Sequence, residues 1–165
     1  MYLKGCLLIA VSATLVFAGC KKADQYPIEP VITFKSLSTI KDANGYDNEG
    51  VLEIEFTDGD GDLGLNPGDT ISPYTGEYSN NVHAIFYRFI NGSWTPWSQF
   101  DDVGRIPVIT PEGNQKAIRG VIRKDHIGFP LNVTNLRVRF DVYIYDRALH
   151  KSNVVTTSEI IINTL

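Results

Sequence analysis

The sequence predicts an all-β fold, a single antiparallel two-sheet sandwich of about seven strands over residues 31–165. Apolar residues in this region recur at every second position, as in a strand with one buried face, and no run has the period of an amphipathic helix. Asn91-Gly92, a dipeptide typical of a type I′ hairpin turn, separates two of these runs. Short alternating runs divided by turns favour an Ig-like or fibronectin-III-like Greek key, and an open barrel is the alternative.

The expected strands differ in the strength of their pattern. The clearest begins with Leu136, Val138 and Phe140, which alternate with polar residues. Residues 82–90 are apolar at most positions, as expected of a central strand. Pro96 has no backbone donor, so the strand that returns from the hairpin is expected at an edge or a bulge. In chain order we expect strands over residues 31–34, 51–57, 82–90, 93–100, 116–123, 135–145 and 154–162, with long loops over 58–80 and 101–114.

The N-terminus has the pattern of a secretory signal peptide over residues 1–19. Lys4 supplies a positive charge, residues 5–17 are apolar or small, and Ala18-Gly19 precede a cleavage position. The apolar run is shorter than the roughly 20 residues that a membrane-spanning helix needs. Residues 20–30 then form a polar, proline-bearing tether.

Cys20 makes the interpretation of this signal peptide more specific. Phe17-Ala18-Gly19-Cys20 resembles the lipobox of bacterial lipoproteins, with Phe in place of the usual Leu. The resemblance implies that the chain is cut before Cys20 and that its sulfur and new amino group are acylated, which anchors the protein to a membrane. Lys21, rather than Asp, at the next position resembles outer-membrane sorting. The alternative is a plain secretory signal with a chance cysteine.

The remaining 146 residues (165 less 19) carry a net negative charge. They contain 14 Lys and Arg (15 less Lys4) and 19 Asp and Glu, a net charge of about −5. Nucleic acid is excluded as a partner because the chain offers no basic stripe to neutralise phosphates. Cys6 leaves with the signal peptide and Cys20 is used by lipid, so no disulfide is expected.

The segment Asp58-Gly59-Asp60-Gly61-Asp62-Leu63-Gly64 carries the strongest chemical signal. Its three carboxylates repel one another unless a cation binds them. Calcium suits them because it takes roughly six to eight oxygen ligands in a flexible shell, whereas magnesium prefers fewer carboxylates. We exclude an EF-hand, since Leu63 occupies the position that requires Gly and strands flank the loop. The alternative is a solvated turn whose side chains bond their own backbone.

Asp146 is a fourth candidate metal ligand. If residues 51–57 and 135–145 are strands B and F of an Ig-like sandwich, their C-terminal ends lie at the same pole. Asp146 would then approach Asp58, Asp60 and Asp62, and one calcium ion would hold two loops together.

Two segments resemble a family of small Bacteroidota lipoproteins: residues 54–64 (IEFTDGDGDLG) and residues 145–153 (YDRALHKSN). The resemblance implies a secreted, lipid-anchored Ig-like domain, in a family mostly without assigned activity. Asp69-Thr70-Ile71 also fits the three-residue O-glycosylation pattern of that phylum, with Thr70 as the acceptor.

Trp94 and Trp97 are the candidate ligand platform. Large aromatic side chains with a polar handle are common on binding surfaces, and here they would stack against sugar rings or contact a protein partner. The alternative is that one tryptophan covers the edge of the core and the other is partly exposed.

The sequence favours a protein without catalytic activity. His83, His126 and His150 are dispersed, and neither a Gly-x-Ser-x-Gly nor a His-Glu-x-x-His motif occurs. The main hypothesis is a lipid-anchored, non-catalytic module for binding or assembly at a bacterial cell envelope, stabilised by calcium. A carbohydrate-binding accessory lipoprotein is the first alternative, and a small hydrolase is the second. The membrane is a partner through the lipid, and the other partner is an unidentified envelope protein or glycan.

Overall fold

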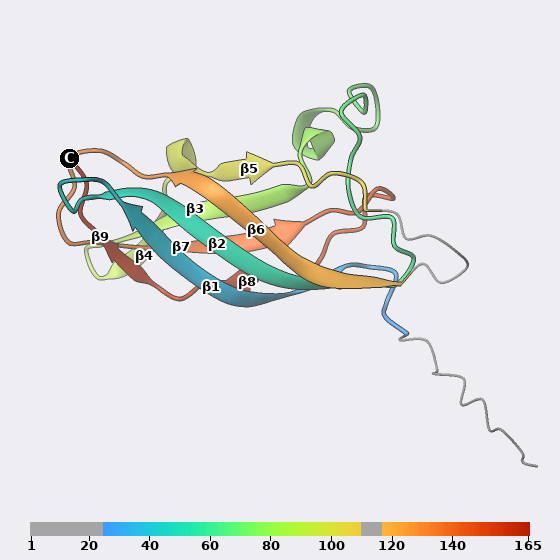
Figure 1. Ribbon diagram of the computed structural model, residues 1–165, viewed down its shortest axis with the longest axis horizontal. Coiled ribbons are helices and arrows are strands. Elements are labelled where there is room, and N and C mark those ends of the chain that lie inside the picture. Colours follow the sequence, from blue (N-terminus) through green and yellow to red (C-terminus); the bar gives the residue numbers. More distant parts are fainter. Residues whose placement is uncertain (1–24, 110–116) are drawn as a thin grey trace, which may run out of the picture.

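Two antiparallel sheets lie face to face in the computed structural model, which describes residues 25–109 and 117–165 (Figure 1). The predicted signal peptide and Cys20 lie outside these residues. The three-stranded sheet has the order β1-β2-β6, and the six-stranded sheet has the order β4-β3-β7-β8, with β5 beside β3 and β9 beside β7. The bounds are β1 (Val31–Lys41), β2 (Asp47–Asp58), β3 (Val82–Ile90), β4 (Ser93–Pro96), β5 (Asp102–Gly104), β6 (Ile118–Gly128), β7 (Leu136–Ile144), β8 (Val155–Thr156) and β9 (Ile160–Ile162), with 3-10 helices η1 (Gly76–Ser79) and η2 (Ser98–Phe100).

The predicted fold class is confirmed. A sheet of the first, second and sixth strands facing a sheet built around the third and seventh is the Greek-key arrangement expected of an Ig-like sandwich. The tight hairpin is also present, because Asn91 (φ 50°) and Gly92 (φ 79°) both take the left-handed conformation that its turn needs. As predicted, Pro96 lies on an edge strand, since β4 pairs only with β3.

The strand bounds differ from the prediction where polar residues continue a ladder. β1 and β2 extend to Lys41 and from Asp47, forming a long hairpin that the apolar pattern alone does not reveal. The return strand stops at Pro96, and η2 follows it. The last predicted strand is split into β8 and β9, because Thr157 turns its backbone and hydroxyl to Phe140. These breaks give nine strands in the described part of the chain.

The core lies between the sheets and is filled from both. Phe86 and Phe140, both 0% exposed, pack edge to face with ring centroids 5.3 Å apart. Ile32, Leu52 and Ile54 of the three-stranded sheet are buried in the same cluster. Alternation along β7 is complete, with its apolar residues inward and Arg, Asp and Tyr outward.

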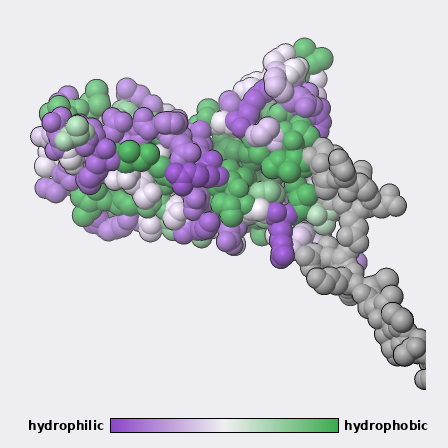
Figure 2. All heavy atoms as spheres, in the orientation of Figure 1, coloured by the Kyte–Doolittle hydropathy of each residue, from purple (hydrophilic) through white to green (hydrophobic). Residues whose placement is uncertain are grey.

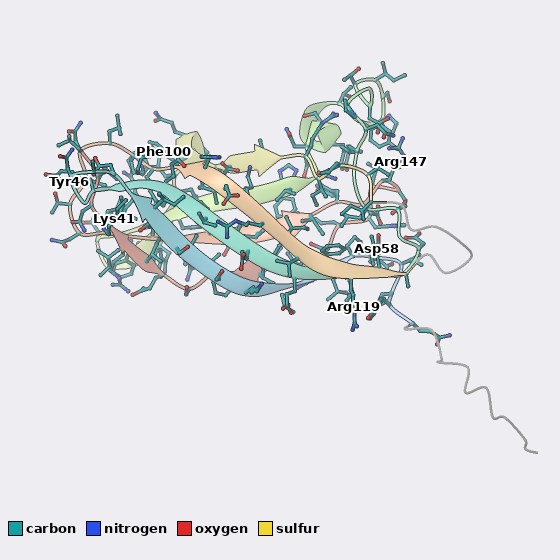
Figure 3. The ribbon with its side chains drawn as sticks, viewed as in Figure 1. Lys41, Tyr46, Asp58, Phe100, Arg119 and Arg147 are labelled. Carbon is teal, nitrogen blue, oxygen red and sulfur yellow. The ribbon has the colours of Figure 1, made fainter. Side chains whose placement is uncertain are left out.

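The two ends of the sandwich differ in what they hold. The β1–β2 hairpin and the C-terminus lie at one end, and the described N-terminal residues enter at the other, beside Asp58 (Figures 1 and 3). At the hairpin end, the buried Asp47 accepts hydrogen bonds from the Thr39 hydroxyl (2.6 Å) and the Asn163 N–H (2.8 Å). None of the helices in residues 25–109 and 117–165 could cross a membrane.

Candidate metal centre

The acidic loop leaves β2 at Asp58 and is held in place by its own residues. Leu63 is 0% exposed and belongs to the hydrophobic core, which explains why Leu stands where an EF-hand has Gly. Gly64 (φ +115°) passes so close to the segment around Pro107 that a Cβ would lie 2.4 Å from the Pro107 carbonyl oxygen. Leu65 then donates a backbone hydrogen bond to Ile106 (2.9 Å). The loop is therefore clamped on the core side, and its aspartates are fixed in position.

Asp58, Asp60 and Asp62 form one cluster. Each offers a carboxylate oxygen, and these oxygens all lie within 4.8 Å of one another. Asp58 is 0% exposed, and neither of its oxygens has a hydrogen-bond partner. One oxygen each of Asp60 and Asp62 is also buried without a partner. An uncompensated buried carboxylate costs several kcal/mol, so this arrangement needs either protons or a cation.

The pKa values follow from this crowding. Burial, together with the neighbouring Asp60, raises the pKa of Asp58 from 3.8 to about 7. Burial and the charge of Asp146 raise the pKa of Asp62, although the backbone N–H groups of Ala148 and Arg147 oppose the shift. A bound cation would reverse this effect and keep all the carboxylates ionised.

The structure brings the loop after β7 to the acidic loop, as the strand B and strand F argument predicts. The Arg147 N–H donates to the Asp62 carbonyl oxygen at 3.2 Å. Asp146 is 1% exposed, and its Oδ1 accepts from the His150 N–H (2.7 Å) while its Oδ2 contacts His150 Nδ1 (2.8 Å). Asp146 thus adds charge beside the cluster, but His150 already engages its oxygens. Its role as a metal ligand stays a prediction.

An arginine-based clamp holds the loop that follows. Arg105 donates to the carbonyl oxygens of Ser79 (2.6 Å), Asn66 (3.0 Å) and Asp69 (2.7 Å). Arg147 pairs with the Asp69 carboxylate. The sequence does not reveal the role of Arg105, because its partners are backbone carbonyls, nor that of Arg147, because Asp69 lies 78 positions away in the chain. Thr70 is exposed in this loop, and its glycosylation stays a prediction.

Trp94 and Trp97 do not share a face. Trp94 pairs with Phe89 on the outer face of the six-stranded sheet, and their ring centroids are 5.2 Å apart. Trp97 packs against the core, with its centroid 4.6 Å from Phe100 and 6.1 Å from Phe86. Only Trp94 is therefore placed to contact a ligand on the outer face. The predicted alternative, one tryptophan at the edge of the core and one partly exposed, describes this arrangement.

Arginines stack on the aromatic side chains around Trp94. The Arg139 guanidinium lies 4.5 Å from the Trp94 centroid and 5.7 Å from that of Tyr87. The Arg137 guanidinium lies 4.2 Å from Phe89 and 5.7 Å from Trp94. We call Tyr87, Phe89, Trp94, Arg137 and Arg139 the arginine–aromatic ladder. Arg137 pairs with Glu159, whereas Arg139 has no ion pair within the described residues and its Nε is buried without a partner.

The three histidines lie in separate surroundings. His83 is buried and stacks on Tyr143 with centroids 4.8 Å apart, and burial lowers its pKa. His126 is exposed and contacts Glu49, while His150 contacts Asp146.

Two open pockets have residues of the three-stranded sheet in their linings. One has a volume of about 670 Å³ and Glu55 as its acidic lining residue, and the other has a volume of about 420 Å³ and Asp125. Figure 2 shows apolar side chains gathered between the three-stranded sheet and the loop that protrudes between β2 and β3. Ile109 and Val121 line the second pocket. Glycosidic bond cleavage requires two carboxyl groups facing each other. Neither lining therefore supplies the pair that the hydrolase hypothesis needs.

Comparison of the chain with protein-family models, curated proteins and solved structures found no match.

Proposed function

We propose that this protein is a lipid-anchored, non-catalytic β-sandwich module of a bacterial cell envelope, and that calcium stabilises the end of the sandwich nearest its anchor. Asp58 carries the proposal, because it is a fully buried carboxylate with no hydrogen-bond partner on either oxygen, next to two further carboxylates. A solvated turn offers no explanation for such a group, since its side chains would bond water or their own backbone.

Calcium fits the donor set better than other common cations. The ligands are all oxygens, and three carboxylates with flexible glycines between them suit its variable coordination. Zinc favours sites with nitrogen and sulfur ligands, and magnesium keeps most of its water. Asp58, Asp60 and Asp62 would hold the ion, with Asp146 as the fourth carboxylate. By bringing together the loops after β2 and β7, the ion would stiffen one end of the module.

The anchor follows from the lipobox-like residues before Cys20. Two or more acyl chains hold a protein stably on a membrane, whereas one chain does so only marginally. The sandwich would then act in binding or assembly beside the membrane. Lys21 after Cys20 favours the outer membrane, and the partner would be an envelope protein or a glycan.

Calcium titration of the full chain, purified in detergent with its N-terminal modification, tests the metal centre. We expect saturable heat of binding by calorimetry and a higher melting temperature, both of which a chelator reverses. A specific ion stabilises the folded state by about 2.7 kcal/mol at 100 times its dissociation constant. Equal melting curves with calcium and with chelator would refute the proposed metal centre. Mass spectrometry of the mature N-terminus tests the anchor separately.

The second candidate function is carbohydrate binding by the arginine–aromatic ladder. The Arg139 guanidinium lies over the Trp94 ring, 4.5 Å from its centroid, and an arginine can bind a carboxylate in a bidentate manner. The chemistry therefore suits a glycan that contains uronic acids. Binding to such a glycan on an array, lost in Trp94→Ala and kept in Val121→Ala on the opposite sheet, would support this function. Equal binding by the two variants would refute it.

A further inference from the structure

The tether contacts the acidic loop directly. The Gly59 N–H donates to the Pro27 carbonyl oxygen at 2.8 Å. A Cβ at Gly59 would lie 2.3 Å from the Tyr26 carbonyl oxygen and 2.5 Å from that of Pro27, closer than atoms can approach. Gly59 lies between Asp58 and Asp60 in the sequence. The backbone of residues 26–27 therefore packs against the residue that links two of the proposed calcium ligands.

The loop after β7 forms hydrogen bonds with the backbone of Ile32, a few residues after the tether contact. The Asn153 side chain accepts from the Ile32 N–H (2.8 Å) and donates to the Ile32 carbonyl oxygen (2.9 Å). Asn153 follows the turn in which His150 binds Asp146. Residues 26–32 thus touch both loops that supply carboxylates to the proposed metal centre.

We propose that the metal centre and the tether form one unit, in which bound calcium fixes residues 25–30 against the acidic loop and thereby sets how far the domain stands from its lipid anchor. This inference rests on the proposed calcium site. Without a cation, the clustered carboxylates repel one another, and spreading of Asp58 and Asp60 displaces the Gly59 N–H that lies between them. The coupling is reciprocal, so a docked tether also strengthens calcium binding.

Because the tether is short, docking of a few residues changes the reach of the domain by a large fraction. A chain of 11 residues, from 20 to 30, spans at most about 40 Å when extended. Docking of residues 25–30 takes six of these residues out of the span, so the maximum reach falls to about 18 Å. With Cys20 acylated, calcium would halve the reach of the domain and keep its acidic end close to the membrane.

Fluorescence anisotropy of a label on the tether tests the coupling. A dye is attached to Gln25→Cys, an exposed position, in the full chain with Cys20 acylated and its signal peptide removed. We expect calcium to raise the limiting anisotropy of this dye, and to leave unchanged a dye on Ser93→Cys in the distant hairpin. Calorimetry on the same samples measures calcium binding independently.

Gly59→Ala is the uncoupling variant, because its Cβ displaces the tether while every carboxylate is kept. We expect the dye at position 25 to stay mobile in calcium, and calcium affinity to fall roughly 5-fold or more. Asn153→Ala, which removes the second grip, provides the same test if Gly59→Ala does not fold. Calcium binding without any change of anisotropy in the parent protein would overturn the inference and leave the calcium site intact. Absence of calcium binding would overturn both.

Discussion

Asp58→Asn should raise the melting temperature of the calcium-free protein and abolish its response to calcium. The two effects have one cause, because the carboxylate that destabilises the empty site is the one that binds the ion. Most substitutions of a buried polar residue lower stability, so a gain in the calcium-free state is a distinctive result.

The size of the effect follows from the pKa of Asp58, which burial and Asp60 raise from 3.8 to about 7. One pKa unit corresponds to about 1.4 kcal/mol, so full ionisation at pH 8 costs at most about 4 kcal/mol. Since neighbouring acids share this charge, roughly half of the cost belongs to Asp58 alone. The new amide can donate to Asp60 or Asp62, which limits its own desolvation cost. The net gain of about 1–2 kcal/mol raises the melting temperature by roughly 3–6 °C.

The pH dependence has a defined sign. A carboxyl group whose folded-state pKa is raised binds its proton more tightly in the folded protein than in the unfolded chain. The calcium-free protein should therefore lose stability as pH rises from about 4 to about 7, and Asp58→Asn should lose less. Excess calcium removes the slope in the parent protein because the ion keeps the carboxylates charged.

Differential scanning calorimetry at pH 5 and pH 8, with calcium or chelator, measures all of these effects. Asp125→Asn is the matched control, since Asp125 is exposed on β6 and pairs with Arg123. This control should change stability by less than about 0.5 kcal/mol and keep the calcium response. If Asp58→Asn lowers the calcium-free melting temperature and the parent protein ignores calcium, the buried carboxylate has another partner and the reasoning fails.

Three further predictions concern the core, the hairpin end and the anchor. Leu63→Ala should cost about 2–4 kcal/mol in denaturant unfolding, because it opens a cavity and frees the acidic loop; a loss below 1 kcal/mol would show that the loop does not depend on this anchor. Asp47→Ala should cost about 2–4 kcal/mol at pH 7, since it leaves the Asn163 N–H and the Thr39 hydroxyl unpaired. Burial favours a higher pKa for Asp47, but Thr39, Asn163 and Lys41 together lower the pKa below 3.8. The stability that Asp47 contributes is therefore present above pH 3.8, and the difference in stability between variant and parent should close as the pH falls below that value. Cys20→Ser should move the protein from the membrane fraction to the soluble fraction, and unchanged fractionation would refute the lipid anchor.

The sequence predicts a strand well where the polar or apolar character of its residues marks both of its faces. β3 has the predicted bounds, and β7 lies one residue inside its predicted range at each end, because apolar runs or strict alternation mark their whole length. The first hairpin is longer than predicted because polar residues continue its ladder as far as Lys41 and Asp47. Backbone pairing with a neighbouring strand holds such residues, and their side-chain types do not reveal it.

The candidate site could be predicted only in part for the same reason. Alternate aspartates on a glycine-rich loop are local, so their closeness follows from spacing, and the approach of the loop after β7 follows from sandwich topology. The tether contact at Gly59 could not be predicted, since it depends on backbone atoms far apart in the sequence. The separation of Trp94 and Trp97 agrees with the predicted alternative, because residues three positions apart in a strand face opposite sides.

The distance between the two candidate sites explains why they can serve one function without interfering. Arg137 and Arg139 lie near the start of β7 and Asp146 just beyond its end, so roughly 23–30 Å of strand separates the arginine–aromatic ladder from the acidic loop. Charges that far apart are screened at physiological ionic strength, where the Debye length is about 8 Å. Calcium therefore cannot tune the ladder through its charge. Because the tether enters beside Asp58, however, a calcium ion that draws this end toward the membrane would direct the ladder away from it, where a glycan or a protein partner can reach it.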